Sequence, residues 1–358
     1  MAGRVAVRAG EAYPVEVGCG LDVGALAAAA LEVGDCALLT DSTVGPLYAG
    51  RVRRSLRAAG WRVLETVEVP AGEGSKSLAV YGEVLRRLAR AGLMRDGALF
   101  ALGGGVVGDL GGFVAASYMR GISLVMLPTT LLAMVDSSVG GKTGLDLPEG
   151  KNLVGAFLQP RLVAADLGFL ESLPRRELSM GLAEVVKMGL LAGGRLFGAL
   201  QRLAEALAGD ARALEELVLL SVSFKAGVVA EDERERGRRA ILNYGHTVGH
   251  GLEAASGYGL AHGEAVAAGM VAEALLSRRV FGTDLVGLHE RLLREAGLPV
   301  RVRGLEAAEV LGAMRRDKKR RGGEHRFVLL REVGRPVWGV EVGEEEALSA
   351  VEAVLEAA

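Results

Sequence analysis

The stretch Ala98-Leu-Phe-Ala-Leu-Gly-Gly-Gly-Val-Val-Gly-Asp109 decides the fold of the first half of the chain. Its apolar start predicts a buried strand over residues 98–102, which the glycine cluster ends. The next residues match the pattern Gly-x-Gly-x-x-Gly and open a predicted helix that runs through Ala116. Glycines at such a turn let the backbone approach a pyrophosphate, whose charge meets the N-terminus of the helix. The stretch therefore predicts a dinucleotide-binding strand–turn–helix unit.

Two features of this turn depart from the usual dinucleotide fingerprint. It does not follow the first predicted strand, and Asp109 comes directly after the last glycine instead of an acidic residue about 20 positions later. A tight turn without a ligand is therefore the alternative. Asp41, after a predicted strand, is a candidate for a ribose hydroxyl, and Glu73 and Lys76 offer further polar contacts.

Apolar runs and helical patterns alternate around this stretch. Strands are also predicted at 36–40, 62–69 and 124–127, and helices at 45–59 and 78–91. From Arg175 onward the predicted helices are 177–191, 196–207, 211–230, 248–255, 264–280, 285–296 and 344–357, with strands only at 326–330 and 337–342. We therefore expect an α/β domain with a parallel sheet over residues 1–173 and a mainly α-helical domain over residues 174–358.

Composition limits the class of protein. The chain has 358 residues, 50% hydrophobic and 24% charged, which fits a globular protein of two domains. The 42 basic and 44 acidic residues give a net charge of −2, which argues against nucleic-acid binding. Cys19 and Cys36 are too few for a disulfide framework. The longest apolar run, 122–135, is too short to span a membrane, and the start lacks the apolar core of a signal peptide. We expect a cytoplasmic enzyme.

Lysine is scarce in this chain. Only seven of the 42 basic residues are lysine, and the rest are arginine. Lysine offers a compact ammonium with a movable proton, which arginine lacks. The lysines are therefore candidates for chemistry: Lys76, Lys142, Lys151, Lys187, Lys225, Lys318 and Lys319.

Small polar residues are concentrated after Pro128. Pro128-Thr-Thr130 is followed by Val135-Asp-Ser-Ser-Val-Gly-Gly-Lys-Thr143 and Gly150-Lys-Asn152, which predict a polar loop. Its Gly-Gly-Lys-Thr resembles the end of a P-loop, but Asp136 stands where that motif needs its first glycine, so a kinase or ATPase is disfavoured. Lysines in this loop are suited to a phosphate or carboxylate of the substrate.

Three of the five histidines lie close together in the sequence, at His246, His250 and His262. His246 and His250 are four residues apart on one helix face, and spacing alone pairs them as metal ligands. Upstream, Glu184 and Lys187 lie on an otherwise apolar helix, where burial is costly without a partner such as a cation. A site of His, His and Glu leaves zinc the open position that catalysis requires.

Together these motifs resemble the 3-dehydroquinate synthase family over nearly the whole chain. Nine segments carry the resemblance, in the same order as in the family: 103–109, 118–121, 128–133, 135–142, 150–152, 183–187, 242–247, 262–266 and 317–319. The resemblance implies a Rossmann-like N-terminal domain and a helical C-terminal domain. It also implies a homodimer.

The resemblance implies a reaction of the shikimate pathway, in which 3-deoxy-D-arabino-heptulosonate 7-phosphate becomes 3-dehydroquinate and phosphate. NAD oxidises one alcohol, phosphate leaves by elimination, NADH restores the alcohol, and ring opening with an intramolecular aldol closure completes the product. Three alternatives stay open. They are a related cyclase acting on another sugar phosphate, a metal-dependent polyol dehydrogenase, and a non-catalytic NAD-binding regulator.

The resemblance also assigns site residues. Glu184, His246 and His262 would hold a divalent metal, Zn²⁺ or Co²⁺, and this set replaces the pair suggested by spacing. His250 would assist proton transfer. Arg120 would bind phosphate in the site of the neighbouring subunit. Residues implied to surround the substrate or to hold its charged ends are Lys142, Lys151, Asn152, Lys187, Lys225, Glu235, Arg239, Asn243 and Lys318. Residues implied to contact NAD or position its loops are Asp41, Glu73, Lys76, Gly104, Gly105, Val106, Asp109, Thr129, Thr130, Asp136, Lys142, Lys151 and Ser172.

Overall fold

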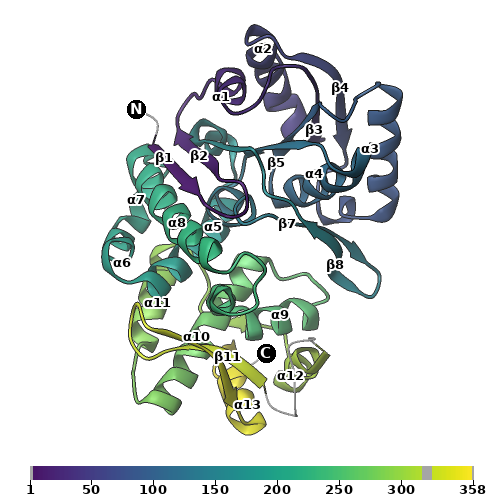
Figure 1. The fold of residues 1–358 in the computed structure, drawn as a ribbon. Helices are drawn as coiled ribbons and strands as arrows, with labels where there is room; N and C mark the ends of the chain where they lie inside the picture. The colour runs from purple at the N-terminus through teal and green to yellow at the C-terminus, as the bar shows by residue number, and fades with distance from the viewer. Residues whose placement is uncertain (1–2, 317–324, 357–358) are drawn as a thin grey trace. The chain divides into compact units, whose positions relative to one another are not determined.

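A computed structural model describes residues 3–316 and 325–356 of the chain (Figure 1). It divides into two compact units, Met1–Leu173 with Lys225–Arg234, and Pro174–Phe224 with Glu235–Ala358. A single cut after Leu173 would leave residues 225–234 in the second unit. They belong to the first because Lys225 bonds Asp136, and Glu233 accepts a hydrogen bond from Gln159.

The N-terminal unit is built on a seven-stranded sheet in the order β1-β2-β9-β6-β5-β3-β4. Every neighbouring pair is parallel except β1 and β2, which are antiparallel. The strands are β1 (Gly3–Val7), β2 (Tyr13–Gly18), β3 (Asp35–Asp41), β4 (Arg62–Val69), β5 (Ala98–Gly103), β6 (Ser123–Pro128) and β9 (Leu162–Asp166). The predicted α/β class is confirmed, and so are the strands now seen as β3 to β6. β1, β2 and β9 were not predicted, since each is short and only its partners in the sheet complete its burial.

Four α-helices connect these strands: α1 (Val23–Ala30), α2 (Gly50–Ala58), α3 (Leu78–Arg90) and α4 (Gly105–Ser117). α2 and α3 confirm the predicted helices, although a π-helical turn, Gly45–Ala49, precedes α2. Each buries a pair of apolar residues four apart, Val52 with Leu56 and Val84 with Leu88. That spacing places both side chains on the face that covers the sheet.

The loop predicted after Pro128 is only partly a loop. Its second part forms an antiparallel hairpin of β7 (Lys142–Leu147) and β8 (Gly150–Phe157). Glycines make this pairing possible, because a Cβ on Gly155 would lie 2.2 Å from the carbonyl oxygen of Thr143. The prediction of an unpaired polar loop was therefore wrong for these residues.

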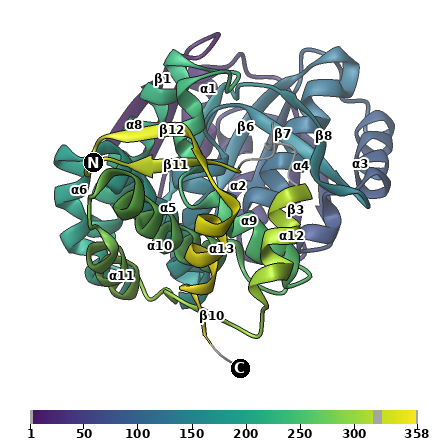
Figure 2. The ribbon, with the colours of Figure 1, turned by 90° about the horizontal axis from the view of Figure 1, so that it is seen from below.

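The second unit is mainly helical, as predicted. Its helices are α5 (Arg175–Ala192), α6 (Gly194–Ala199), α7 (Leu203–Leu207), α8 (Ala211–Glu231, which continues into the first unit), α9 (His246–Ala255), α10 (His262–Phe281), α11 (Val286–Glu295), α12 (Ala307–Arg316) and α13 (Glu344–Glu352). The strands are β11 (His325–Leu330) with β12 (Pro336–Val342), and β10 (Val302–Arg303) with β13 (Leu355–Glu356). α10 packs against α9 and α5 (Figure 2).

Two predicted helices of this unit differ from the structure. The helix predicted over 196–207 is divided into α6 and α7 by a 3₁₀ turn at Leu200–Arg202. The last predicted helix ends at Glu352 rather than 357, because the chain then extends and pairs with β10 as β13. Helical periodicity does not reveal either break, and the second depends on β10, which is distant in sequence.

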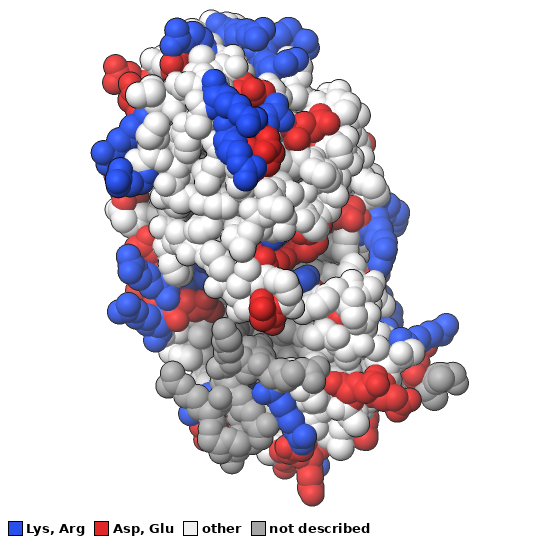
Figure 3. Space-filling model, turned by 90° about the vertical axis from the view of Figure 1, so that its right-hand side faces the viewer, with Lys and Arg blue, Asp and Glu red and all other residues white. Residues whose placement is uncertain are grey.

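On the face drawn in Figure 3, basic side chains lie among acidic ones rather than forming one basic surface. No helix of residues 3–316 and 325–356 is both long and apolar enough to cross a membrane.

Candidate active site

In the N-terminal unit, β5 runs directly into α4 through the predicted glycine turn. Gly104 caps the helix and Gly105 is its first residue. The glycines are required by close packing, because a Cβ on Gly103 would lie 2.6 Å from Val107. The amide of Thr129, which follows β6, donates to the carbonyl of Gly103 at 3.0 Å. The predicted NAD residues at 104–106 and 129–130 thus meet at the carboxyl ends of neighbouring parallel strands, where open α/β sheets bind ligands.

Asp41 lies at the same end of the sheet, on β3 beside β5. One of its carboxylate oxygens, Oδ1, accepts the backbone N–H groups of Thr43 and Val44, at 2.8 and 2.9 Å. These bonds fix the orientation of the carboxylate. Ser172 is exposed at the end of a 3₁₀ turn, and its hydroxyl is 2.6 Å from that of Tyr48.

Lys76 is the centre of a polar cluster in this unit. Its ammonium donates to Oδ1 of Asn152 at 2.6 Å and lies 2.9 Å from Oδ2 of Asp109. Glu73 and Asp146 are 3.5 and 3.8 Å away. Burial lowers the pKa of Lys76, but these carboxylates more than offset it and raise the pKa. Lys76 therefore joins Asp109 of α4 to the β7–β8 hairpin, in addition to any contact with NAD.

The other predicted cations of this unit are Lys142, Lys151, Lys225 and Arg120. Lys225 donates to the side chain of Asp136 at 2.5 Å and to its carbonyl at 2.6 Å. Lys142 and Lys151 are exposed on the hairpin, with the Lys151 ammonium 4.0 Å from Glu73. Arg120 is exposed in the turn after α4, with φ at +65°.

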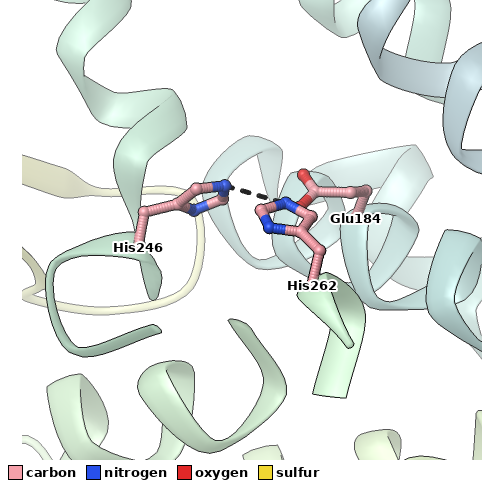
Figure 4. Close-up of side chains that lie close together, drawn as sticks. All are labelled: Glu184, His246 and His262. Carbon is pink, nitrogen blue, oxygen red and sulfur yellow. Dashed lines mark ion pairs between the residues drawn. The ribbon is translucent and has the colours of Figure 1, made fainter. Parts of the chain in front are cut away.

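In the helical unit, three helices bring Glu184, His246 and His262 together (Figure 4). Glu184 comes from the middle of α5, and the two histidines are the first residues of α9 and α10. Oε1 of Glu184 is 3.6 Å from Nε2 of His246 and 3.7 Å from Nε2 of His262. One ligand atom from each lies within 4.8 Å of the others, which is the spacing of a metal-binding set.

His250 lies one turn beyond His246 on α9, with its ring centre 5.3 Å from that of His246. It is grouped not with His246 but with Glu253 and His262. The pairing of His246 with His250 suggested by spacing alone is therefore not the set that the structure assembles around Glu184.

Hydrogen bonds set the orientation of both histidines. Nδ1 of His246 is 3.0 Å from the carbonyl oxygen of Tyr244, and Nδ1 of His262 is 3.3 Å from Oε2 of Glu253. With both Nδ1 atoms engaged in this way, both Nε2 atoms face Glu184. Glu253 was not identified from the sequence. It lies seven residues after His246 on the same face of α9, so helical spacing could have found it.

The electrostatics of this cluster favour a cation. Glu184 is fully buried, and among the described residues neither carboxylate oxygen has a hydrogen bond of normal geometry, although Lys187 forms an ion pair with it. Burial raises the pKa of Glu184, but Lys187 and His262 more than offset this and lower the pKa to about 2. Burial lowers the pKa of His262, while Glu184 and Glu253 raise it to about 10. His262 therefore holds a proton beside Glu184 and Glu253. A divalent ion bound here would neutralise the same carboxylates. The three ligands offer one oxygen and two nitrogens, a donor set that suits Zn²⁺ or Co²⁺.

The remaining predicted residues of the helical unit are Glu235, Arg239, Asn243 and Lys318. Arg239 is buried in the 3₁₀ segment Arg238–Asn243. The amide of Asn243 donates to Oε1 of Glu235 at 2.6 Å, so Glu235 fixes the Asn243 side chain. Lys318 lies outside the described residues.

Solved structures of similar fold first define the class. The chain matches 2-deoxy-scyllo-inosose synthase, solved with carbaglucose-6-phosphate, NAD⁺ and Co²⁺, at TM-score 0.90 and 26% identity over 99% of this chain and 100% of that one. It matches ValA, the 2-epi-5-epi-valiolone synthase of Streptomyces hygroscopicus subsp. jinggangensis 5008, solved with NAD⁺ and Zn²⁺, at TM-score 0.88 and 27% identity over 98% and 99%. Glycerol dehydrogenase from Schizosaccharomyces pombe shares the fold, at TM-score 0.69 and 18% identity over 99% and 91%. The fold is that of the sugar phosphate cyclases.

Sequence comparison then gives the family. The family models for the 3-dehydroquinate synthase N-terminal and C-terminal domains match residues 66–180 and 181–320. The 3-dehydroquinate synthase of Acidithiobacillus ferrooxidans (strain ATCC 53993 / BNL-5-31) is 49% identical over 352 residues, 96% of each chain. That of Symbiobacterium thermophilum is 51% identical over 328 residues, 89% of this chain and 91% of the relative. The chain belongs to the 3-dehydroquinate synthase family.

Proposed function

We propose that this protein converts 3-deoxy-D-arabino-heptulosonate 7-phosphate to 3-dehydroquinate and phosphate, with NAD at the β5–α4 turn and a divalent metal at Glu184, His246 and His262. The observation that carries the proposal is the convergence of these three side chains from separate helices, with both imidazole Nε2 atoms within 3.7 Å of one buried carboxylate oxygen. Family membership supplies the substrate.

The bound groups supply the chemistry that side chains lack: NAD accepts and returns a hydride, and a divalent metal acts as a Lewis acid toward adjacent hydroxyl oxygens. The protein supplies binding, orientation and proton movement. Glu184, His246 and His262 hold the metal, with Zn²⁺ as the expected ion and Co²⁺ as a substitute. The glycine turn presents backbone N–H groups at a helix N-terminus, which suits a pyrophosphate.

The chain's cations and amides suit a substrate with a phosphate and a carboxylate. Lys142, Lys151 and Asn152 are exposed on the β7–β8 hairpin, where an ammonium can bind either anion as a point charge. In the helical unit, Arg239 and the Asn243–Glu235 pair are assigned to the substrate, and Lys187 to charge balance beside Glu184. His250 is assigned to proton transfer, since its ring lies beside the metal-binding set.

The main alternative is that the protein is a related cyclase that acts on another sugar phosphate. Identity is 49% and 51% to 3-dehydroquinate synthases, against 26% and 27% to the inosose and valiolone synthases. The likeness to glycerol dehydrogenase is one of fold alone. A homodimer in the cytoplasm, with Arg120 reaching the site of the neighbouring subunit, is part of the same proposal.

The test uses purified protein with Zn²⁺ or Co²⁺, a trace of NAD and the heptulosonate phosphate. We expect phosphate release, formation of 3-dehydroquinate and no net NADH, because the hydride returns within each turnover. NADH accumulating in step with turnover would instead indicate a dehydrogenase. Phosphate released only from another sugar phosphate would assign the protein to a sister cyclase.

Arg120 provides a test of the shared site. Two inactive variants, Arg120→Ala and His246→Ala, are mixed under conditions that allow subunits to exchange. If Arg120 acts in the partner's site, mixed dimers regain one complete site and part of the activity. No recovery from a dimer shown to exchange would place Arg120 in its own subunit's site.

A further inference from the structure

The helices α9 and α10 each begin with one of the two histidines of the metal-binding set, His246 and His262. Each helix also carries a glutamate that contacts the start of the other. Glu253 of α9 lies 3.3 Å from Nδ1 of His262. Glu273 of α10 accepts a hydrogen bond of 2.7 Å from the backbone N–H of Gly245, the residue before His246.

Glu273 is fully buried and lies eleven residues after His262, about three helical turns away. It is not part of the metal-binding set, and the proposed reaction gives it no task. A carboxyl group in such a position is costly unless a specific partner receives it. One partner is the Gly245 N–H at the N-terminus of α9, where an acidic group is favoured.

One planar peptide group links Glu273 to His246. The N–H that binds Glu273 belongs to Gly245, and the C=O of the same peptide group belongs to Tyr244. That carbonyl oxygen is 3.0 Å from Nδ1 of His246. Because the peptide is planar and trans, fixing its N–H direction also fixes its C=O direction. Accepting at the N–H also strengthens the carbonyl as an acceptor, because hydrogen bonds in a chain polarise one another.

The close packing of α9 and α10 leaves this peptide little freedom. Gly245 has φ at +79°, and a Cβ there would lie 2.9 Å from the carbonyl oxygen of Val266. On α10, a Cβ on Gly269 would lie only 1.9 Å from the carbonyl oxygen of Gly245. Gly269 and Glu273 are four residues apart, so one face of α10 provides both the space for Gly245 and the acceptor for its N–H.

Tyr244 is anchored independently on its other side. Its side chain is fully buried, and its hydroxyl is 2.7 Å from Nε2 of His289. The peptide group is therefore held by Glu273 at its N–H, and the residue that supplies its carbonyl is held by His289.

We propose that Glu273 is a positioning residue for the metal site: through the Tyr244–Gly245 peptide it fixes the hydrogen bond to Nδ1 of His246 and so directs Nε2 toward Glu184. The inference rests on the proposed function, in which these ligands bind a divalent metal. His262 is oriented by a carboxylate directly, and His246 by a carboxylate acting through one peptide group.

Two conservative variants test this. Glu273→Gln keeps the length of the side chain and an acceptor oxygen for Gly245, whereas Glu273→Asp keeps the carboxylate but withdraws it by one methylene. Each purified, metal-free protein is titrated with Co²⁺, and the visible absorption of the bound ion gives both affinity and ligand geometry. We expect Glu273→Asp to weaken Co²⁺ binding about 10- to 100-fold and to change the spectrum, as loss of an outer partner does. We expect Glu273→Gln to stay within about threefold of the unaltered protein.

Ser277→Ala is the matched control. Ser277 is buried one turn further along α10, where its hydroxyl donates to the carbonyl of Glu273 and accepts the N–H of Leu330. This variant is expected to lose thermal stability with unchanged Co²⁺ affinity and spectrum. A Co²⁺ affinity in Glu273→Asp equal to that of Glu273→Gln would overturn the inference. Failure of the unaltered protein to bind Co²⁺ would instead overturn the proposed metal site.

Discussion

The two units of this protein each bury a lysine beside carboxylates, but they balance the charges differently. In the N-terminal unit, Lys76 is surrounded by Asp109, Glu73, Asp146 and the amide of Asn152. In the helical unit, Lys187 pairs with Glu184, which also faces the imidazoles of two histidines. The first cluster has more carboxylates than ammonium groups and contains no imidazole. The second places two imidazole Nε2 atoms beside its buried carboxylate, a donor set that suits a divalent metal.

The largest expected effect tests whether the second cluster binds a metal. His246→Ala removes one of its ligands, so we expect the protein to lose bound metal and activity to fall by at least about 10³-fold. His250→Ala should keep the metal and slow the reaction about 10²- to 10⁴-fold, as loss of a proton-transfer group does. Metal content by elemental analysis and initial rates separate the two. Equal metal loss in both variants would restore the His246–His250 pair as ligands.

The next effect concerns the ammonium beside Glu184. Lys187→Met leaves that carboxylate without its ion pair, which we expect to cost about 3–5 kcal/mol in the metal-free protein. Added Zn²⁺ should then stabilise the variant more than the unaltered protein, because the metal can replace the missing charge. Thermal unfolding with and without Zn²⁺ measures the difference. If Zn²⁺ raised the stability of both proteins by the same amount, the metal would not be replacing the charge of Lys187.

Lys76→Met is the corresponding change in the N-terminal unit. We expect about 2–3 kcal/mol of lost stability, less than for a fully enclosed pair, since Asp109 and Asp146 are only half-buried. Zn²⁺ should not compensate, because this cluster contains no nitrogen ligand for it. If Zn²⁺ restored the stability of the Lys76→Met variant, the two clusters would not differ in their response to the metal.

The last effect, smaller within one pH unit than the loss from either lysine substitution, is a pH dependence from His289. Burial lowers the pKa of His289 to about 4, from 6.5. Below pH 6.5 the unfolded chain gains a proton that the folded protein does not. The free energy of unfolding should therefore fall by up to about 1.4 kcal/mol per unit as pH drops from 6.5 toward 4, with no contribution above that window.

His289→Gln should remove that component of the slope. Urea unfolding of both proteins at several pH values between 7 and 4.5 measures it. Parallel pH profiles for the two proteins would show that His289 is protonated in the folded state as well.

The sequence predicted the elements whose signal is local. The strand and glycine turn of β5 and α4 follow from one uninterrupted stretch, and α2 and α3 follow from apolar residues four apart. The hairpin of β7 and β8 did not follow, because its pairing depends on glycines that allow two backbones to approach. The end of α13 was mispredicted for a similar reason, since β13 exists only because β10 lies beside it.

The residues of the candidate site also fall into two groups: those that the sequence could reveal and those that only the fold brings together. Glu184, His246 and His262 could be named because their segments resemble a known family, whereas helical spacing alone favoured His246 with His250. Glu253 shares a helix face with His246, so it could have been found from helical spacing. Glu273 could not have been found in this way, because it accepts a hydrogen bond from a backbone N–H at the start of another helix. A sequence motif of side chains does not reveal such a contact.

The amino-acid sequence by itself determined the alternation of strands and helices, the glycine turn, the identity of the candidate ligands and the family, because these depend on residues near one another or on motifs read in order. Tertiary structure alone decided which nitrogen of each histidine faces Glu184, that Lys76 is enclosed by acidic partners, and that Glu273 reaches the start of α9. Those outcomes depend on how close two helices or strands pack, and packing distance is set by contacts between residues far apart in the chain.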